Sequence, residues 1–106
     1  MFPPFCDIAL LTLTGSEEHY LLRSSELLAA SVKELAEGDF KDVELVTFGP
    51  FEAPVYRVDN KYRMRMVIKC RLQKRTLAMF AELLCSFSRK VGRRVSLGID
   101  FNPSNL

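Results

Sequence analysis

The chain has 106 residues, of which 48% are hydrophobic and 26% are charged, and its formal net charge is +2. This length excludes two domains of ordinary size, and the composition is that of a globular chain rather than a disordered one. No apolar run approaches the roughly 18 to 20 residues that a membrane-spanning helix needs, and the N-terminus lacks a secretory signal segment, so we expect one cytoplasmic domain over residues 1–106.

The first third of the chain predicts a strand followed by a helix. Residues 5–14 are apolar and partly β-branched, which predicts a strand, and their nearly continuous apolar character favours a central position in a sheet. Residues 17–37 predict an amphipathic helix, with Ser16 as its N-cap and Gly38 at its end. Its apolar stripe consists of Leu21, Leu28, Val32 and Leu35.

The middle of the chain predicts two strands separated by a loop. Residues 43–48 predict the second strand, and the glycine and prolines of residues 49–54 predict a rigid loop that breaks it. Residues 62–71 have the clearest period-two pattern in the chain, which predicts a strand with two different faces. One face consists of Tyr62, Met64, Met66, Ile68 and Cys70, and the other of Arg63, Arg65, Lys69 and Arg71.

The last third predicts a second helix and a final strand. The helix runs from about residue 74 to the residue before Gly92, and residues 95–101 alternate again. The expected apolar stripe of the helix consists of Leu77, Phe80, Leu84, Phe87 and Val91. The resulting order, β-α-β-β-α-β, favours an α+β fold of the split β-α-β type, in which two helices cover one face of an antiparallel four-stranded sheet.

The charge is unevenly distributed along the chain. Residues 1–56 carry ten acidic and three basic side chains, a net charge of −7, whereas residues 57–106 carry twelve basic and three acidic ones, a net charge of +9. Seven of the basic side chains fall within fifteen residues: Lys61, Arg63, Arg65, Lys69, Arg71, Lys74 and Arg75.

Two explanations of this basic cluster remain open. A localised basic surface is suited to phosphate groups or to an acidic peptide. Alternatively, the cluster is a solvated strand face, with further cations at the end of the second helix. If the ligand is nucleic acid, we expect contacts to the backbone without base reading, because no aromatic side chain alternates with the arginines.

Catalysis and metal binding find little support in the sequence. Phosphate-cradling glycine loops and nucleophile motifs are missing, and His19 is the only histidine. The three cysteines, Cys6, Cys70 and Cys85, are far apart and lie in apolar segments, so we expect buried thiols rather than a zinc site. The 106 residues are therefore expected to be non-catalytic and to hold no cofactor.

Four segments, in this order and spacing, resemble a known family. They are Phe2-Pro3-Pro4-Phe5 before the first strand, residues 48–55 (Phe-Gly-Pro-Phe-Glu-Ala-Pro-Val), Lys61-Tyr62-Arg63, and residues 95–103 (Val-Ser-Leu-Gly-Ile-Asp-Phe-Asn-Pro). Together they resemble the C-terminal domain of the primosomal protein N′ family, the replication-restart DNA helicases of bacteria.

The resemblance implies that these residues are the C-terminal fragment of a longer primosome protein. In that family the preceding part of the chain is an ATP-dependent 3′ to 5′ helicase core, and ATP, magnesium and zinc belong to that part. The C-terminal domain resembles a small-subunit ribosomal protein in fold, helps to bind DNA at forks and D-loops in the nucleoid, and docks on the helicase core among other primosome proteins.

The resemblance also implies a role for the basic residues. A basic side chain near the start of the second helix contributes to the pocket for the acidic tail of single-stranded DNA-binding protein, and Lys74 or Arg75 matches that position. Lys61, Arg63, Arg65, Lys69 and Arg71 are then expected to contact DNA phosphates. The alternative is a purely structural domain that docks on the helicase core without binding DNA.

Overall fold

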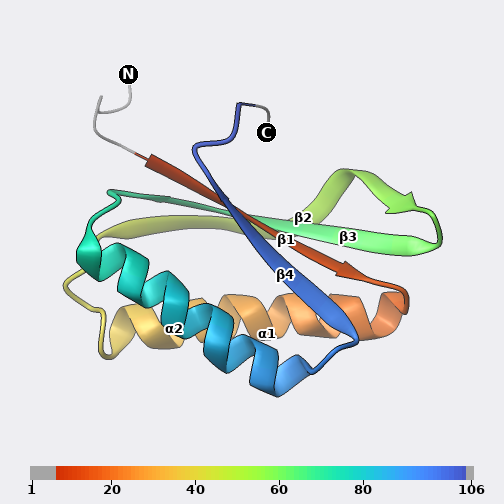
Figure 1. Cartoon of the computed structure of the whole chain (residues 1–106), viewed down its shortest axis with the longest axis horizontal. Coiled ribbons are helices and arrows are strands. Elements are labelled where there is room, and N and C mark those ends of the chain that lie inside the picture. The colour runs from red at the N-terminus through yellow and green to blue at the C-terminus, as the bar shows by residue number, and fades with distance from the viewer. Residues whose placement is uncertain (1–6, 105–106) are drawn as a thin grey trace.

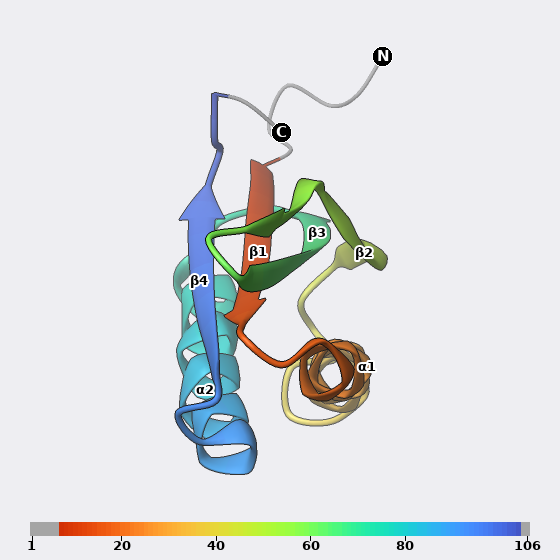
Figure 2. The same cartoon turned by 90° about the vertical axis from the view of Figure 1, so that its right-hand side faces the viewer.

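In the computed structural model, which describes residues 7–104, the chain folds in the predicted order of four strands and two helices. The elements are β1 (Asp7–Gly15), α1 (Glu18–Glu37), β2 (Leu45–Val58), β3 (Lys61–Cys70), α2 (Lys74–Val91) and β4 (Val95–Phe101). The strands form one antiparallel sheet in the order β2-β3-β1-β4 (Figure 1). Both helices lie on the same face of this sheet (Figure 2). The expected fold and the central position of the first strand are confirmed, and the expected start of that strand at residues 5 and 6 lies outside the described residues.

The hydrophobic core lies between the sheet and the helix layer. On β1 and β3 every second side chain points into it, because successive side chains of a strand alternate between the two faces. The buried members of the cluster are Ala9, Leu11, Leu13, Leu21, Leu28, Val32, Phe40, Met64, Met66, Ile68, Cys70, Met79, Phe80, Leu83, Phe87, Val91 and Val95. Burial of these side chains is the main favourable contribution to folding.

The first helix packs its predicted apolar residues against the core but begins one residue later than predicted, at Glu18. Leu21, Leu28 and Val32 are buried. The N-cap is Glu17 rather than Ser16, because the carbonyl oxygen of Glu17 accepts the first helical hydrogen bond, from the backbone N–H of Leu21 at 3.0 Å. Gly38 follows the last helical residue, as expected.

The second strand is longer than the sequence predicted. The expected loop at residues 49–54 is part of β2, which pairs with β3 through two interruptions of register, one between Phe48 and Phe51 and one between Glu52 and Arg57. β2 is an edge strand, so it pairs on one side only and tolerates prolines and bulges that a central strand does not. Gly49 takes a φ of +103°, which side-chain-bearing residues rarely adopt.

The second helix confirms three of its five predicted core residues, Phe80, Phe87 and Val91, but its buried face is turned relative to the predicted stripe. Its buried residues are Thr76, Met79, Phe80, Leu83, Phe87 and Val91. Leu77 and Leu84, which were expected in the core, are 48% and 37% exposed. Cys85 is also exposed, so the expectation of buried thiols fails there, while Cys70 is buried and Cys6 lies outside the described residues.

The face of the sheet opposite the helices, called the helix-free face below, is not flat, because part of the β2–β3 hairpin lies above it. The hairpin between β2 and β3 turns at Asp59 and Asn60, both with positive φ, a conformation suited to a tight two-residue turn. The second half of β2 rises above the sheet on the side away from the helices (Figure 1). Leu10 and Ala53 are buried outside the main core cluster.

Within residues 7–104, no helix is long and apolar enough to cross a membrane.

Candidate basic and aromatic surface

Three of the predicted phosphate-binding residues lie together on the helix-free face. Arg63, Arg65 and Lys69 share one face of β3 with the half-buried Val67, and the residues that alternate with them, Met64, Met66 and Ile68, are buried against the helices. Lys69 is exposed and the two arginines are half-buried. We call Arg63, Arg65 and Lys69 the basic row. Their common face confirms the period-two interpretation of this strand.

The two arginines are held differently by the hairpin. Arg63 donates hydrogen bonds from Nε and Nη2 to the carbonyl oxygen of Val55, at 3.2 and 3.0 Å. A guanidinium has five N–H donors, so these two bonds leave its positive charge and most of its donors for an anion. The Nε atom of Arg65 is buried and has no hydrogen-bond partner among the residues that the structure describes. Arg63 is therefore positioned by the backbone of β2, whereas Arg65 keeps an unpaired donor.

Two phenylalanines on β2 lie beside the basic row. Phe48 is opposite Val67 and Phe51 is opposite Arg65 in the β2–β3 pairing, which places both rings on the helix-free face. They are 45% and 40% exposed. The Nζ atom of Lys69 lies 5.4 Å from the centre of the Phe48 ring, within the range of a cation–π interaction. We call Phe48 and Phe51 the aromatic pair.

The sequence did not predict the aromatic pair, for a definable reason. Residues three apart on a regular strand point to opposite faces, and the sequence places Phe48 at the end of a strand but Phe51 in a loop. The extra residue of the bulge between Phe48 and Phe51 restores the same face to both. The motif Phe-Gly-Pro-Phe was visible in the sequence, but its relation to the arginines of β3 depends on strand pairing.

The other two predicted phosphate-binding residues lie at the ends of β3. Lys61 is exposed at the start of the strand, directly after the hairpin turn. Arg71 is exposed directly after the last residue of the strand. The pKa of the nearby Asp7 carboxyl is lowered by a hydrogen bond from the backbone N–H of Leu72 first, then by the side chain of Asn102 and by the charge of Arg71. All five residues thus follow one strand from end to end.

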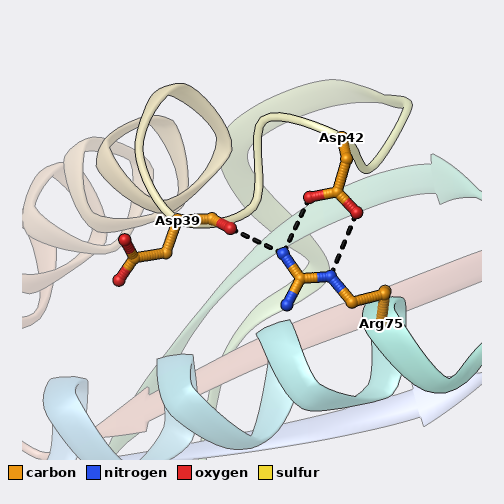
Figure 3. A network of polar contacts seen from close by, with 3 residues as sticks. All are labelled: Asp39, Asp42 and Arg75. Atoms are coloured by element: carbon orange, nitrogen blue, oxygen red, sulfur yellow. Dashed lines mark hydrogen bonds and ion pairs between the residues drawn. The ribbon is translucent and has the colours of Figure 1, made fainter.

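The two candidates at the start of α2 have different surroundings. Lys74 is the first residue of the helix and is exposed. Arg75 binds Asp42 through two hydrogen bonds, Nη2 to Oδ1 at 2.7 Å and Nε to Oδ2 at 3.0 Å, and Nη2 also donates to the backbone oxygen of Asp39 at 2.6 Å (Figure 3). Its guanidinium lies 4.5 Å from the centre of the Phe40 ring. Arg75 therefore connects α2 to the segment between α1 and β2, and a ligand would have to compete with Asp42 for it.

This ion pair predicts a small pH dependence of stability. The hydrogen bonds from Arg75 lower the pKa of the Asp42 carboxyl below its ordinary value of 3.8. A lowered pKa in the folded state stabilises the fold above the unfolded pKa, and this contribution disappears as the pH falls through the folded pKa. Urea unfolding at pH 7 and pH 3 is therefore expected to show a larger loss of stability for the unchanged chain than for Asp42→Asn. The difference will be modest, because both side chains are half-exposed, and equal losses would show that the pair contributes nothing.

Four further basic residues, Arg89, Lys90, Arg93 and Arg94, lie at the other end of α2 or directly after it. Lys90 donates a hydrogen bond to Ser31 on α1, at 3.4 Å, and the Arg94 guanidinium lies over the ring of Tyr20. Cations at this position interact favourably with the helix C-terminus, which is sufficient to explain them. In the part of the chain that the structure describes, no group of three or more His, Cys, Asp or Glu residues could hold a metal ion.

Comparisons with solved structures show the fold alone. A de novo designed protein, Foldit4, superposes with a TM-score of 0.63 at 9% identity, covering 94% of this chain and 99% of that one. A second designed protein, LFR1 1, described as having a ferredoxin fold, gives a TM-score of 0.59 at 9% identity, covering 96% and 88% of the two chains. A hydantoinase/carbamoylase family amidase from Burkholderia ambifaria gives 0.57 at 13% identity over 91% of this chain and 27% of the amidase. The chain thus has a βαββαβ ferredoxin-like fold.

Comparisons of sequence show the family. The chain is 27% identical over 103 residues to the replication restart protein PriA of Bacillus subtilis (strain 168), a match that covers 96% of this chain and 12% of that protein. The chain therefore spans about an eighth of the length of this relative. A family model described as the primosomal protein N C-terminal domain matches residues 1–104. The chain belongs to the family of C-terminal domains of the primosomal replication-restart protein PriA.

Proposed function

We propose that this domain is a non-catalytic DNA-binding and partner-docking module of a replication-restart helicase. Arg63, Arg65 and Lys69 contact DNA phosphates, together with Lys61 and Arg71 at the two ends of β3. The observation that carries this proposal is the position of the basic row on a sheet face that neither helix covers. The proposed ligand is branched DNA, such as a fork or D-loop, because the relative is described as a replication restart protein.

The start of α2 is the proposed site for the acidic tail of single-stranded DNA-binding protein. Lys74 is the stronger candidate for the tail carboxylate, because it is exposed, whereas the guanidinium of Arg75 is already bound to Asp42. An acidic tail that binds Arg75 has to replace this ion pair. The two residues therefore make separable contributions, and single substitutions with Ala distinguish them in a peptide-binding measurement.

The electrostatic part of the proposal predicts how affinity depends on salt. Each neutralised phosphate on duplex DNA gives a slope of about −0.9 in a plot of log affinity against log salt, so three or four contacts give about −3 to −4. Replacing Arg63 and Arg65 with Ala is expected to weaken binding to all sequences alike and to reduce the slope by about two. Fluorescence anisotropy with labelled duplex and forked DNA at several salt concentrations measures both quantities.

The matched control for this experiment replaces the same two residues with Lys. It keeps both positive charges, so the slope should stay near that of the unchanged chain, even if the hydrogen bonds from Arg63 to Val55 are lost. Circular dichroism of each variant checks that β2 and β3 still pair. Binding that does not depend on salt would contradict the electrostatic mechanism, and loss of binding to particular sequences alone would indicate direct base reading instead.

A second candidate function is docking on the upstream helicase core without DNA binding. It is favoured by exposed apolar side chains at the opposite edge of the sheet, namely Leu77 and Leu84 on α2 and Phe101 on β4. In a pull-down with separately expressed helicase core, Leu77→Ala with Leu84→Ala should abolish capture if this surface is the interface. DNA binding by the same variant should be unchanged if the basic row acts independently.

A further inference from the structure

The aromatic pair is exposed in a way that folding alone does not explain. Burial of a phenylalanine side chain contributes about 1.5 to 3 kcal/mol to stability, yet Phe48 and Phe51 remain 45% and 40% exposed. Neither belongs to the hydrophobic core cluster. Both point to the same face as the basic row, because their partners in β3, Val67 and Arg65, point there.

The two rings are positioned as separate contact points. Their partners on β3 are two residues apart, which corresponds to about 7 Å along the strand. Phe51 packs against Gly49, where a Cβ atom would lie 2.8 Å from the Cδ2 atom of the ring. Glycine at this position therefore lets the ring approach the backbone of β2. The bulge and the glycine together fix the spacing of the pair.

Each ring has a cation next to it. Lys69 lies over Phe48, with Nζ 5.4 Å from the ring centre, and Arg65 is directly opposite Phe51. The acidic residue that follows Phe51, Glu52, is opposite the core-facing Met64 and so belongs to the other face of β2. On β4 the helix-free face carries Asp100, which β1 separates from β3. The surface around the aromatic pair is therefore positively charged.

We propose that Phe48 and Phe51 form a stacking platform for unpaired bases of single-stranded DNA, with Lys69 and Arg65 contacting the phosphates that connect them. Aromatic side chains beside a basic track are the common means of binding single strands without sequence preference. Duplex DNA gains nothing from the rings, because its bases are already stacked on one another. The proposal rests on the proposed DNA binding and adds that this face takes the single-stranded arm of branched DNA.

A tryptophan reporter tests whether a base reaches the ring. The chain contains no tryptophan, so Phe48→Trp and Phe51→Trp each introduce a single one. Titration with oligothymidylate at low salt is expected to quench the fluorescence of both, because the indole ring stacks on the bases. The control is Leu84→Trp, which places an equally exposed reporter on α2 and should not respond. Unchanged fluorescence of both platform variants while anisotropy reports binding would overturn the proposal.

A substitution that keeps the side chains apolar tests whether stacking contributes affinity. Phe48→Leu with Phe51→Leu keeps apolar side chains at both positions but removes the aromatic faces. We expect oligothymidylate to bind about 25-fold more weakly, or about fivefold for each ring, with duplex affinity and salt slope unchanged. The matched control is Leu77→Ala with Leu84→Ala, which trims two exposed apolar side chains of α2 away from the helix-free face and should have no such effect.

The outcomes separate this inference from the function on which it rests. If the leucine variant binds oligothymidylate like the unchanged chain, with a steep salt dependence, stacking is refuted and phosphate binding stands. If the unchanged chain binds neither single-stranded nor forked DNA, the proposed function itself fails. If the leucine variant loses only the binding of a peptide of the acidic tail, the aromatic pair is a peptide site and the proposal is wrong.

Discussion

Charge reversal at Lys61 and Lys69, each to Glu, is expected to lower the affinity for duplex DNA by about 60-fold or more at about 0.1 M salt. Loss of one phosphate contact lowers the affinity about eightfold at this salt concentration, because each contact contributes about 0.9 to the logarithmic salt slope. Two contacts therefore account for about 60-fold, and the introduced carboxylates repel the phosphates in addition. Both lysines are exposed, so the substitutions should leave the fold intact. Anisotropy titration with a labelled duplex gives the affinity directly.

The matched control reverses two exposed lysines elsewhere in the chain. Lys33 lies on α1 and Lys41 in the segment between α1 and β2, and both are exposed. Their replacement with Glu changes the net charge by the same amount, but neither residue lies on β3. The control should weaken binding by no more than a few-fold, through the net charge of the molecule. Equal losses in the two variants would mean that DNA responds to total charge and that β3 is not the binding strand.

The replacement of Leu83 by Ala is expected to lower the free energy of unfolding by about 2 to 5 kcal/mol, and that of Leu84 by less than about 1 kcal/mol. The two leucines are adjacent on α2, but Leu83 is fully buried in the core cluster whereas Leu84 is 37% exposed. The loss of stability at Leu83 has two parts: the transfer free energy of the buried atoms that are removed, and the cost of the cavity that they leave. Urea unfolding monitored by circular dichroism gives both values.

This pair also tests which face of α2 packs on the sheet. The periodicity of the sequence assigns Leu84 to the core, and the structure assigns Leu83. A larger loss for Leu84→Ala than for Leu83→Ala would restore the sequence-based stripe and contradict the packing described above. The denaturant dependence of the two variants should be the same, since neither substitution alters the surface exposed on unfolding by much.

The alternation of β3 is the part of this protein that the sequence predicted most completely. Its period of two separates Met64, Met66 and Ile68 from Arg63 and Arg65, and because this alternation is a local property of extended backbone, no knowledge of neighbouring elements is needed. The same holds for the start and end of α2 and for the order of strands and helices, from which the fold class follows.

The orientation of α2 could be predicted only in part, since the sequence identified Phe80, Phe87 and Val91 but not the other buried residues. The helix carries apolar side chains over more than one stripe, and only packing selects between them. The polar Thr76 is buried on the selected face, where its hydroxyl donates a hydrogen bond to the backbone oxygen of Arg71 at 2.6 Å. A pattern that counts apolar residues passes over this threonine and includes Leu77 and Leu84 instead.

The extent of β2 and the aromatic pair depended on a partner strand. Glycine and proline in residues 49–54 are local signals for a loop, and they are outweighed because β3 supplies hydrogen-bond partners on either side of the bulge. The extra residue of the bulge then places the side chains of Phe48 and Phe51 on the same face of the sheet. Neither effect is encoded within the segment itself.

The sequence by itself determined a basic strand with one face towards the core, because charge and alternation are local properties of the chain. Only the tertiary structure decided which basic residues remain available and what lies beside them. Lys74 and Arg75 are neighbours in the sequence, but Asp42, which is far from both in the chain, engages Arg75. Likewise the aromatic pair meets the basic row only through the pairing of β2 with β3. Contacts between distant segments depend on how the elements pack, which is a property of the whole fold.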